Sequence, residues 1–81
     1  MTYSKADLDM ANEHVALAEE HIGRQERLIL RLSGLELPTE EAERLLEMFH
    51  HSLRLHRDHR DAIEKSVRMA SVSRNQGPLV R

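Results

Sequence analysis

The chain has 81 residues, of which 40% are hydrophobic and 32% are charged, and it contains no cysteine. This composition fits one small helical domain and excludes disulfides, thiol chemistry and full disorder. With one Tyr, one Phe and no Trp, the chain lacks the aromatic platform that single-stranded nucleic acids need. A domain of this length buries limited surface alone and often needs a second subunit.

The sequence also sets expectations about location. No segment approaches the roughly 20 apolar residues of a membrane span. Residues 1–9 lack the basic stretch and apolar run of a secretory signal. We therefore expect a cytoplasmic bacterial protein that makes no membrane contact.

The first helix is predicted over residues 5–33. Ser4-Lys5-Ala6-Asp7 has the form of a capping box, with a hydroxyl at the N-cap and a carboxylate three residues later. Gly34 is expected to end the helix as the residue just past its C-terminus. Between these signals a heptad seam recurs at alternating steps of three and four. Its members are Leu8, Ala11, Val15, Ala18, Ile22, Gln25, Ile29 and Leu32.

The second helix is predicted over residues 39–72. Pro38 cannot continue a helix, and Thr39 is a suitable N-cap before a first turn rich in glutamate. We expect residues 1–72 to form one domain and residues 73–81, with Gly77 and Pro78, to form a disordered tail. This helix has its own seam, consisting of Ala42, Leu46, Phe49, Leu53, His56, Arg60, Ile63, Val67 and Ala70.

The short connection predicts an all-α antiparallel hairpin, because closely linked helices run in opposite directions. A turn near residues 35–36 places Ile22 beside Phe49 and Ala18 beside Leu53. Charge agrees with this pairing, since residues 1–53 carry five basic and eleven acidic residues and residues 54–81 carry seven and three. Arginines 24, 27 and 31 would lie beside the glutamates that begin the second helix. The acidic residues at the start of the chain would lie beside the basic residues at the end of that helix.

A second stripe runs beside the seam of the second helix. It consists of Leu45, Met48, Ser52, Leu55, His59, Ala62, Ser66 and Met69. One partner helix cannot cover so broad a face, so we expect a homodimeric four-helix bundle or an accessory subunit on another protein. The predicted interface residues are Leu45, Met48, Phe49, Ser52, Leu55, His56 and His59. We expect no enzyme and no cofactor, because the sequence has no nucleophile elbow and no phosphate-binding loop.

Six histidines suggest an alternative, a metal-binding module. His56 and His59 lie three residues apart on one helical face, and the hairpin register places His14 beside them. This trio with a water or carboxylate would suit zinc, whereas the competing interpretation places His56 at a helix interface and the others in solvent. Glu47 and His50 have a di-iron spacing, but it occurs only once.

Two further interpretations concern charge. Histidines near a dimer interface, such as His21 level with His50, would loosen that dimer on protonation. A nucleic-acid-associated regulator is disfavoured, because the basic residues of the second helix spread around it and acids interrupt them. These residues are Arg54, Arg57, Arg60, Arg68 and Arg74. Arg60, in the seam, is expected to lay its stem on Ala11 and reach out to Asp7 or another acid.

Three segments carry a resemblance. Residues 21–26 (His-Ile-Gly-Arg-Gln-Glu), 42–47 (Ala-Glu-Arg-Leu-Leu-Glu) and 53–60 (Leu-Arg-Leu-His-Arg-Asp-His-Arg) resemble small uncharacterised α-helical proteins of alphaproteobacteria. This family has no established activity, so the resemblance implies a bacterial cytoplasmic setting and assigns no site residue.

Overall fold

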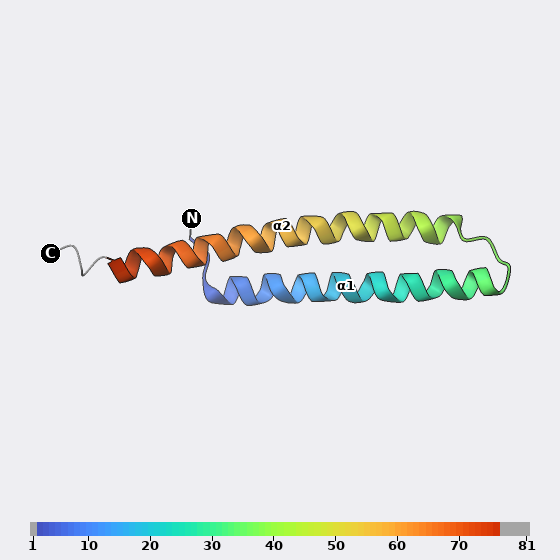
Figure 1. The fold of residues 1–81 in the computed structure, drawn as a ribbon, viewed down its shortest axis with the longest axis horizontal. Coiled ribbons are helices and arrows are strands. Elements are labelled where there is room, and N and C mark those ends of the chain that lie inside the picture. The colour runs from blue at the N-terminus through green and yellow to red at the C-terminus, as the bar shows by residue number, and fades with distance from the viewer. Residues whose placement is uncertain (1, 77–81) are drawn as a thin grey trace.

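The computed structural model describes residues 2–76, which form two helices. Helix α1 spans Lys5–Gly34 and helix α2 spans Glu40–Gln76. Figure 1 shows the two lying side by side in opposite directions, joined by the short turn. Both are packed against each other, and the described residues contain no strand. The predicted all-α antiparallel hairpin is confirmed.

Helix α1 begins as the sequence predicts. The Ser4 hydroxyl accepts the backbone N–H of Asp7 at 3.2 Å, and the Asp7 carboxylate accepts the backbone N–H of Ser4 at 2.9 Å. Two donors that the helix itself leaves without partners are thus satisfied. The carboxylate also lies where the helix dipole favours a negative charge.

Helix α1 ends one residue later than predicted and without help from glycine. Gly34 lies inside the helix, and the left-handed residue is Glu36, with φ of 58°. The Glu36 N–H donates to the carbonyl of Ser33 at 3.0 Å and the Leu37 N–H to that of Leu32 at 2.9 Å, a Schellman motif. Pro38 explains the shift, because it holds Leu37 extended and the chain must reverse just before that residue.

This turn predicts two stabilising substitutions. Glu36→Gly should raise the free energy of unfolding by about 1 kcal/mol, because it removes the side chain from a left-handed position. Gly34→Ala should raise it by about 0.5–1 kcal/mol, since a Cβ there has no neighbouring atom within 4 Å. Urea denaturation measures both. Destabilisation by Gly34→Ala would mean that the chain reverses at Gly34 after all.

Helix α2 begins at Glu40, directly after the predicted N-cap Thr39, and continues past the predicted end. The Glu43 N–H donates to the Thr39 carbonyl at 2.8 Å, and the Thr39 hydroxyl donates to the Glu43 carboxylate. The helix continues to Gln76, past its predicted end at residue 72. Those residues contain no glycine or proline, and nothing in their backbone chemistry stops the helix before Gly77. Residues 77–81 of the predicted tail lie outside the described part.

The core follows the two predicted seams. Its buried hydrophobic residues are Ala11, Val15, Ile22, Leu53 and Ile63, and Ala18, Leu46 and Phe49 pack against the central cluster. Across the helices, the ring of His14 lies 5.6 Å from that of His56, and His21 lies 5.9 Å from Phe49, centroid to centroid. The numbers in each facing pair add up to 70, within one residue of the predicted register.

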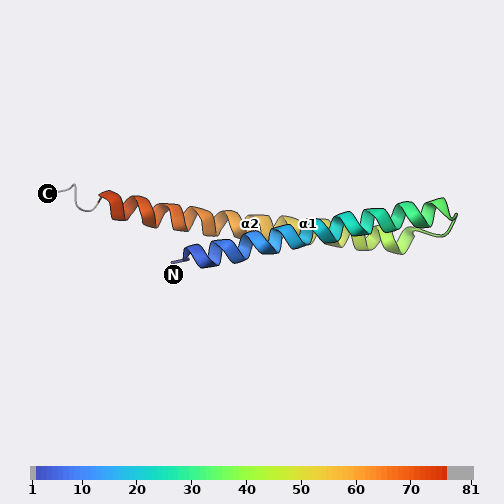
Figure 2. The same cartoon turned by 90° about the horizontal axis from the view of Figure 1, so that it is seen from below.

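The hairpin is a thin rod. Its radius of gyration is 19.3 Å, against about 12 Å for a compact domain of this length. The molecule is 14 Å across in both short directions, which is the thickness of little more than one helix layer. Figures 1 and 2 show that α2 extends beyond the start of α1, so its last turns have no helix beside them within residues 2–76.

Candidate interaction surface

The two sides of the hairpin differ in chemistry. We number the seam residues as heptad positions a and d, with Val15 and Leu53 at a, and Ala18 and Phe49 at d. Positions c and g of both helices then lie on one side, which we name the open face. It comprises Met10, His14, Leu17, His21 and Leu28 of α1, and Leu45, Met48, Ser52, Leu55 and His59 of α2.

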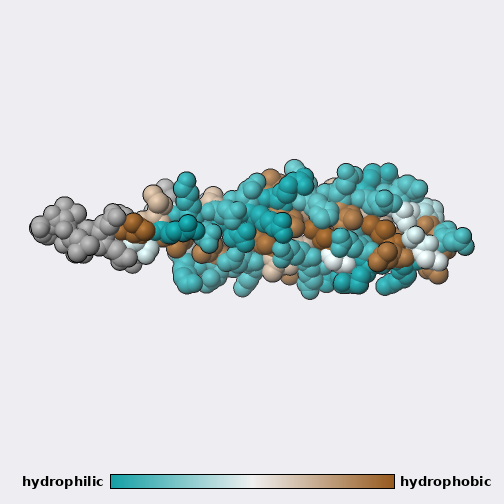
Figure 3. Space-filling model, in the orientation of Figure 1, coloured by the Kyte–Doolittle hydropathy of each residue, from teal (hydrophilic) through white to brown (hydrophobic). Residues whose placement is uncertain are grey.

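Large apolar side chains on the open face are exposed to solvent. Met48 is 65% exposed, Leu55 58% and Leu45 41%, and Met10 and Leu17 are also more than half exposed. The second stripe predicted from the sequence is therefore left uncovered by α1. Figure 3 views the hairpin from the opposite flank, which is largely hydrophilic apart from hydrophobic surface along the line between the helices.

Shallow hollows lined by both helices follow one another along the open face. The central hollow, of about 240 Å³, is lined by Leu17, Ala18, Phe49, Ser52 and three histidines, His14, His21 and His56. Toward the turn, Leu28 lies with Leu45 and Met48. Toward the other end, Met10 and His14 lie with His59 and Ile63. The face therefore alternates apolar and imidazole groups over most of its length.

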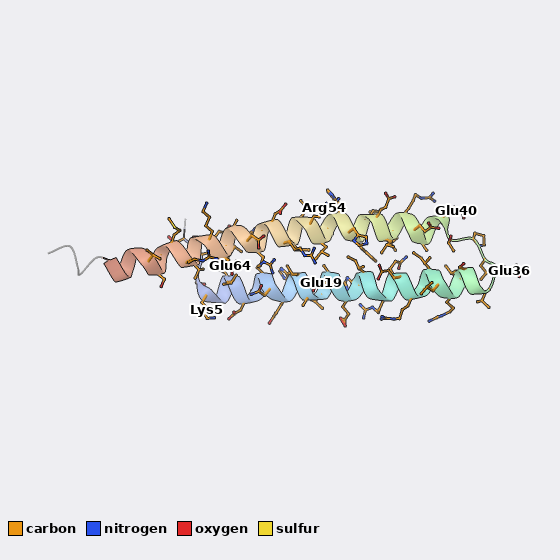
Figure 4. The ribbon with its side chains drawn as sticks, viewed as in Figure 1. Lys5, Glu19, Glu36, Glu40, Arg54 and Glu64 are labelled. Carbon is orange, nitrogen blue, oxygen red and sulfur yellow. The ribbon has the colours of Figure 1, made fainter. Side chains whose placement is uncertain are left out.

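The opposite flank of the hairpin holds the polar contacts between helices. Arg57 forms an ion pair with Glu19 at 2.9 Å, and both side chains are about half exposed. Figure 4 shows that Arg54, which lies on α2, points away from α1 and so does not take part in these contacts. An exposed pair of this kind contributes about 0–1 kcal/mol, so it selects the register more than it stabilises the fold.

Most predicted ion pairs between the helices do not form in the described part of the chain. Glu19 with Arg57 is the one pair there that joins α1 to α2, and arginines 24, 27 and 31 reach none of the glutamates of α2. Arg24 pairs instead with Glu20, one turn away on its own helix. Partners one turn away need less side-chain ordering than partners across the hairpin, which explains the difference.

Arg60 occupies its seam position with its head group turned out of the core. Its Nε donates to the Asp61 carboxylate at 2.7 Å, and Nη1 donates to the side-chain Oδ1 of Asn12 at 3.5 Å. The acid is Asp61 of its own helix, and the expected contact with Asp7 does not form. Arg57 and Arg68 are also paired with acids, so three of the arginines considered for nucleic-acid contact already have carboxylate partners.

The seven predicted interface residues divide into two groups. Leu45, Met48, Leu55 and His59 are exposed on the open face. Phe49, Ser52 and His56 are half-buried, and Phe49 packs against the core of the hairpin. The seven line one continuous surface, with the seam members forming its floor.

The predicted metal trio is not brought together. His14 and His56 are neighbours, whereas the ring of His59 meets Tyr3 edge-on at 6.0 Å. Among the described residues, no group of three or more His, Cys, Asp or Glu side chains could hold a metal ion. The register placed all three at one level correctly, but His59 is at position g and turns toward the N-terminal segment.

Sequence reasoning missed two contacts. Gln25 is buried, and its Nε2 donates to the carbonyl of Ala42 at 2.9 Å, which ties α1 to the first turn of α2. A polar residue at a seam position was the signal available for it. Tyr3 was not singled out, since one aromatic residue ahead of a helix has no periodic signal.

Comparison with known proteins adds no further constraint. No protein-family model, curated protein or solved structure matches the chain. Within residues 2–76, neither helix has an apolar stretch long enough to cross a bilayer.

Proposed function

We propose that this protein is a noncatalytic interaction module that self-associates through the open face as a homodimeric four-helix bundle. The observation that carries the proposal is the continuous row of exposed large apolar residues on one side of both helices. Contiguous apolar surface of this kind marks interaction sites on soluble domains. The row combines Leu17 and Leu28 of α1 with Leu45, Met48 and Leu55 of α2.

Surface area supports this proposal. The chain exposes 6503 Å², against about 5,000 Å² for a compact monomer of 9.4 kDa. The excess of about 1,500 Å² is more than the roughly 800 Å² that each partner buries in a stable interface. A second hairpin that buries about 800 Å² of the open face would remove about half of this excess.

The small core supports it as well. Five hydrophobic residues are buried, and no large side chain in the described part is fully buried. Ordering a residue costs about 1–2 kcal/mol in backbone entropy, so two long helices need more burial than this core supplies. A second apolar interface supplies it.

Analytical ultracentrifugation tests the proposal. Met48→Glu places a charge in the middle of the open face and should weaken the dimer at least about 100-fold, because it buries an unpaired carboxylate. Leu30→Glu is the matched control. Leu30 is 72% exposed at position b, away from the open face, and its substitution should leave the dimer unchanged.

A wild-type protein that stays monomeric at about millimolar concentration would overturn self-association, since specific interfaces bind more tightly than this. Equal weakening by Met48→Glu and Leu30→Glu would place the contact elsewhere on the hairpin. A Met48→Glu variant that still forms the dimer would also show that the contact lies elsewhere on the hairpin.

A further inference from the structure

The charge pattern of the hairpin carries an inference that rests on the proposed self-association. We infer that the two copies stack with their turns at opposite ends, about a two-fold axis that passes the level of Ser52. In this arrangement each helix lies against its own copy. The alternative two-fold arrangement places both turns at the same end and lays α1 against the partner's α2. A symmetric dimer must use one of the two, because residue i meets j and j meets i.

Position f of each helix lies at the outer rim of the open face, and its charges discriminate between the two arrangements. The charged residues exposed there are Glu13, Glu20 and Arg27 of α1 and Arg44, Asp58 and Lys65 of α2. Glu20 is paired with Arg24 of its own helix, and the four that discriminate are Glu13, Arg27, Arg44 and Asp58. Within the residues that the structure describes, none of these four is in an ion pair. They are therefore available to a second copy.

With the turns together, like charges meet. Facing residues in the hairpin have numbers that add up to about 70, as the contacts of His14 with His56 and of His21 with Phe49 establish. The same levels would face each other between copies. Glu13 would then meet the partner's Asp58, and Arg27 would meet the partner's Arg44, which is unfavourable at both ends of the interface.

With the turns apart, opposite charges meet. Glu13 faces the partner's Arg27 about a midpoint at residue 20, and Arg44 faces the partner's Asp58 about a midpoint at residue 51. The two midpoints belong to different helices, yet the hairpin register places residue 20 beside residue 50 or 51. One axis therefore satisfies both helices. Arg31 does not discriminate between the arrangements, because an acid lies near its level in both. This acid is the partner's Asp7 with the turns apart and the partner's Glu41 with the turns together.

Apolar groups agree with the same axis. About residue 51 to 52, Met48 faces the partner's Leu55, and the small Ser52 lies at the centre, where two α2 helices approach most closely. The part of α2 that extends beyond α1, with Met69 62% exposed, then reaches the partner's turn. Leu35 and Leu37 of that turn are exposed in the single hairpin. With the turns together, this extension has no apolar neighbour.

A single cysteine tests the arrangement cleanly, because the chain has none of its own. In Ser52→Cys the two thiols lie close to the axis, within the 3.5–4.5 Å Cβ separation of a disulfide, and mild oxidation should cross-link the dimer. Ser66→Cys is the matched control. It has the same heptad position, but it lies about 20 Å from the axis, so its two thiols are roughly 40 Å apart and should stay reduced.

A charge reversal gives a second test that does not depend on oxidation. Glu13→Arg should weaken the dimer about two- to tenfold with the turns apart, because two like pairs form, and Glu13→Arg with Arg27→Glu should restore it. With the turns together, Glu13→Arg would tighten the dimer, since it meets the partner's Asp58. Sedimentation equilibrium at low salt measures both variants.

The outcomes separate this inference from the proposed function. A wild-type dimer in which Ser52→Cys fails to cross-link, or Ser66→Cys cross-links, overturns the arrangement and leaves self-association in place. Tightening by Glu13→Arg overturns the arrangement too. A wild-type protein that remains a monomer overturns both.

Discussion

Replacing Leu53 by alanine is expected to lower the free energy of unfolding by about 2–5 kcal/mol. Leu53 is only 6% exposed and joins Val15 and Ile22 in the central cluster of the core. Removing it leaves a cavity that two helices cannot close without breaking the seam on either side. Small domains are stable by about 5–15 kcal/mol, so this one change removes a large part of the total.

Leu30→Ala is the control for this prediction. It removes the same atoms from a residue outside both the core and the open face, and its expected effect is within about 0.5 kcal/mol. Urea or thermal denaturation followed by circular dichroism measures both variants at one protein concentration. Similar losses for Leu53→Ala and Leu30→Ala would show that the seam is not the core of this hairpin.

The second large effect expected is on pH dependence. Dimer affinity should fall at least about tenfold between pH 8 and pH 5.5, because imidazole takes up a proton in this range. His14, His21 and His56 line the central hollow, and a second copy would remove water from all three. Loss of water disfavours the charged imidazole, so the dimer binds fewer protons than two separate hairpins. The dimer therefore has its highest affinity at high pH, and the affinity decreases as the pH falls.

The groups around the open-face histidines differ along the hairpin. Arg24 lines the same hollow as His21, and the ring of His56 lies beside that of His14. Asp7 shares the end hollow with His14, His59 and Tyr3. The central hollow has no carboxylate in its lining, so charging is least compensated at the middle of the interface.

Glutamine variants check this prediction. His14→Gln with His21→Gln should flatten the pH profile, because glutamine keeps a polar group of similar size without titrating. His50→Gln is the control, since His50 is exposed at position e on the opposite flank. A wild-type dimer with constant affinity from pH 5.5 to 8, or a control variant that flattens the profile, would contradict the expected role of the central histidines.

Local features could be predicted from sequence because their causes lie within a few residues. The capping box at Ser4 needs only Asp7, three residues away. The seams follow from steps of three and four, and they predicted Val15, Ile22 and Leu53 in the core. The register came from the shortness of the connection, which leaves two helices few ways to meet.

Errors arose where two local signals compete. Glycine favours a left-handed position, yet the reversal occurs at Glu36, because Pro38 constrains Leu37 and the terminal hydrogen bonds run from residues 36 and 37. The predicted ion pairs of arginines 24, 27 and 31 with glutamates of α2 do not form, and Arg24 pairs with Glu20 on its own helix instead. Composition also suggested that the second helix ends at residue 72, but residues 73–76 contain no glycine or proline and α2 continues to Gln76.

The sequence by itself determined the two helices, their antiparallel pairing and the stripe that α1 cannot cover, because periodicity and a short turn act along the chain. Only the tertiary structure decided how the histidines divide, with His14 beside His56 and His59 beside Tyr3, since heptad level does not determine the direction of a side chain. It also decided that c and g positions of both helices share one open face. That result depends on the antiparallel orientation of the pair, which sets g positions beside g positions across the seam and cannot be read from one helix alone.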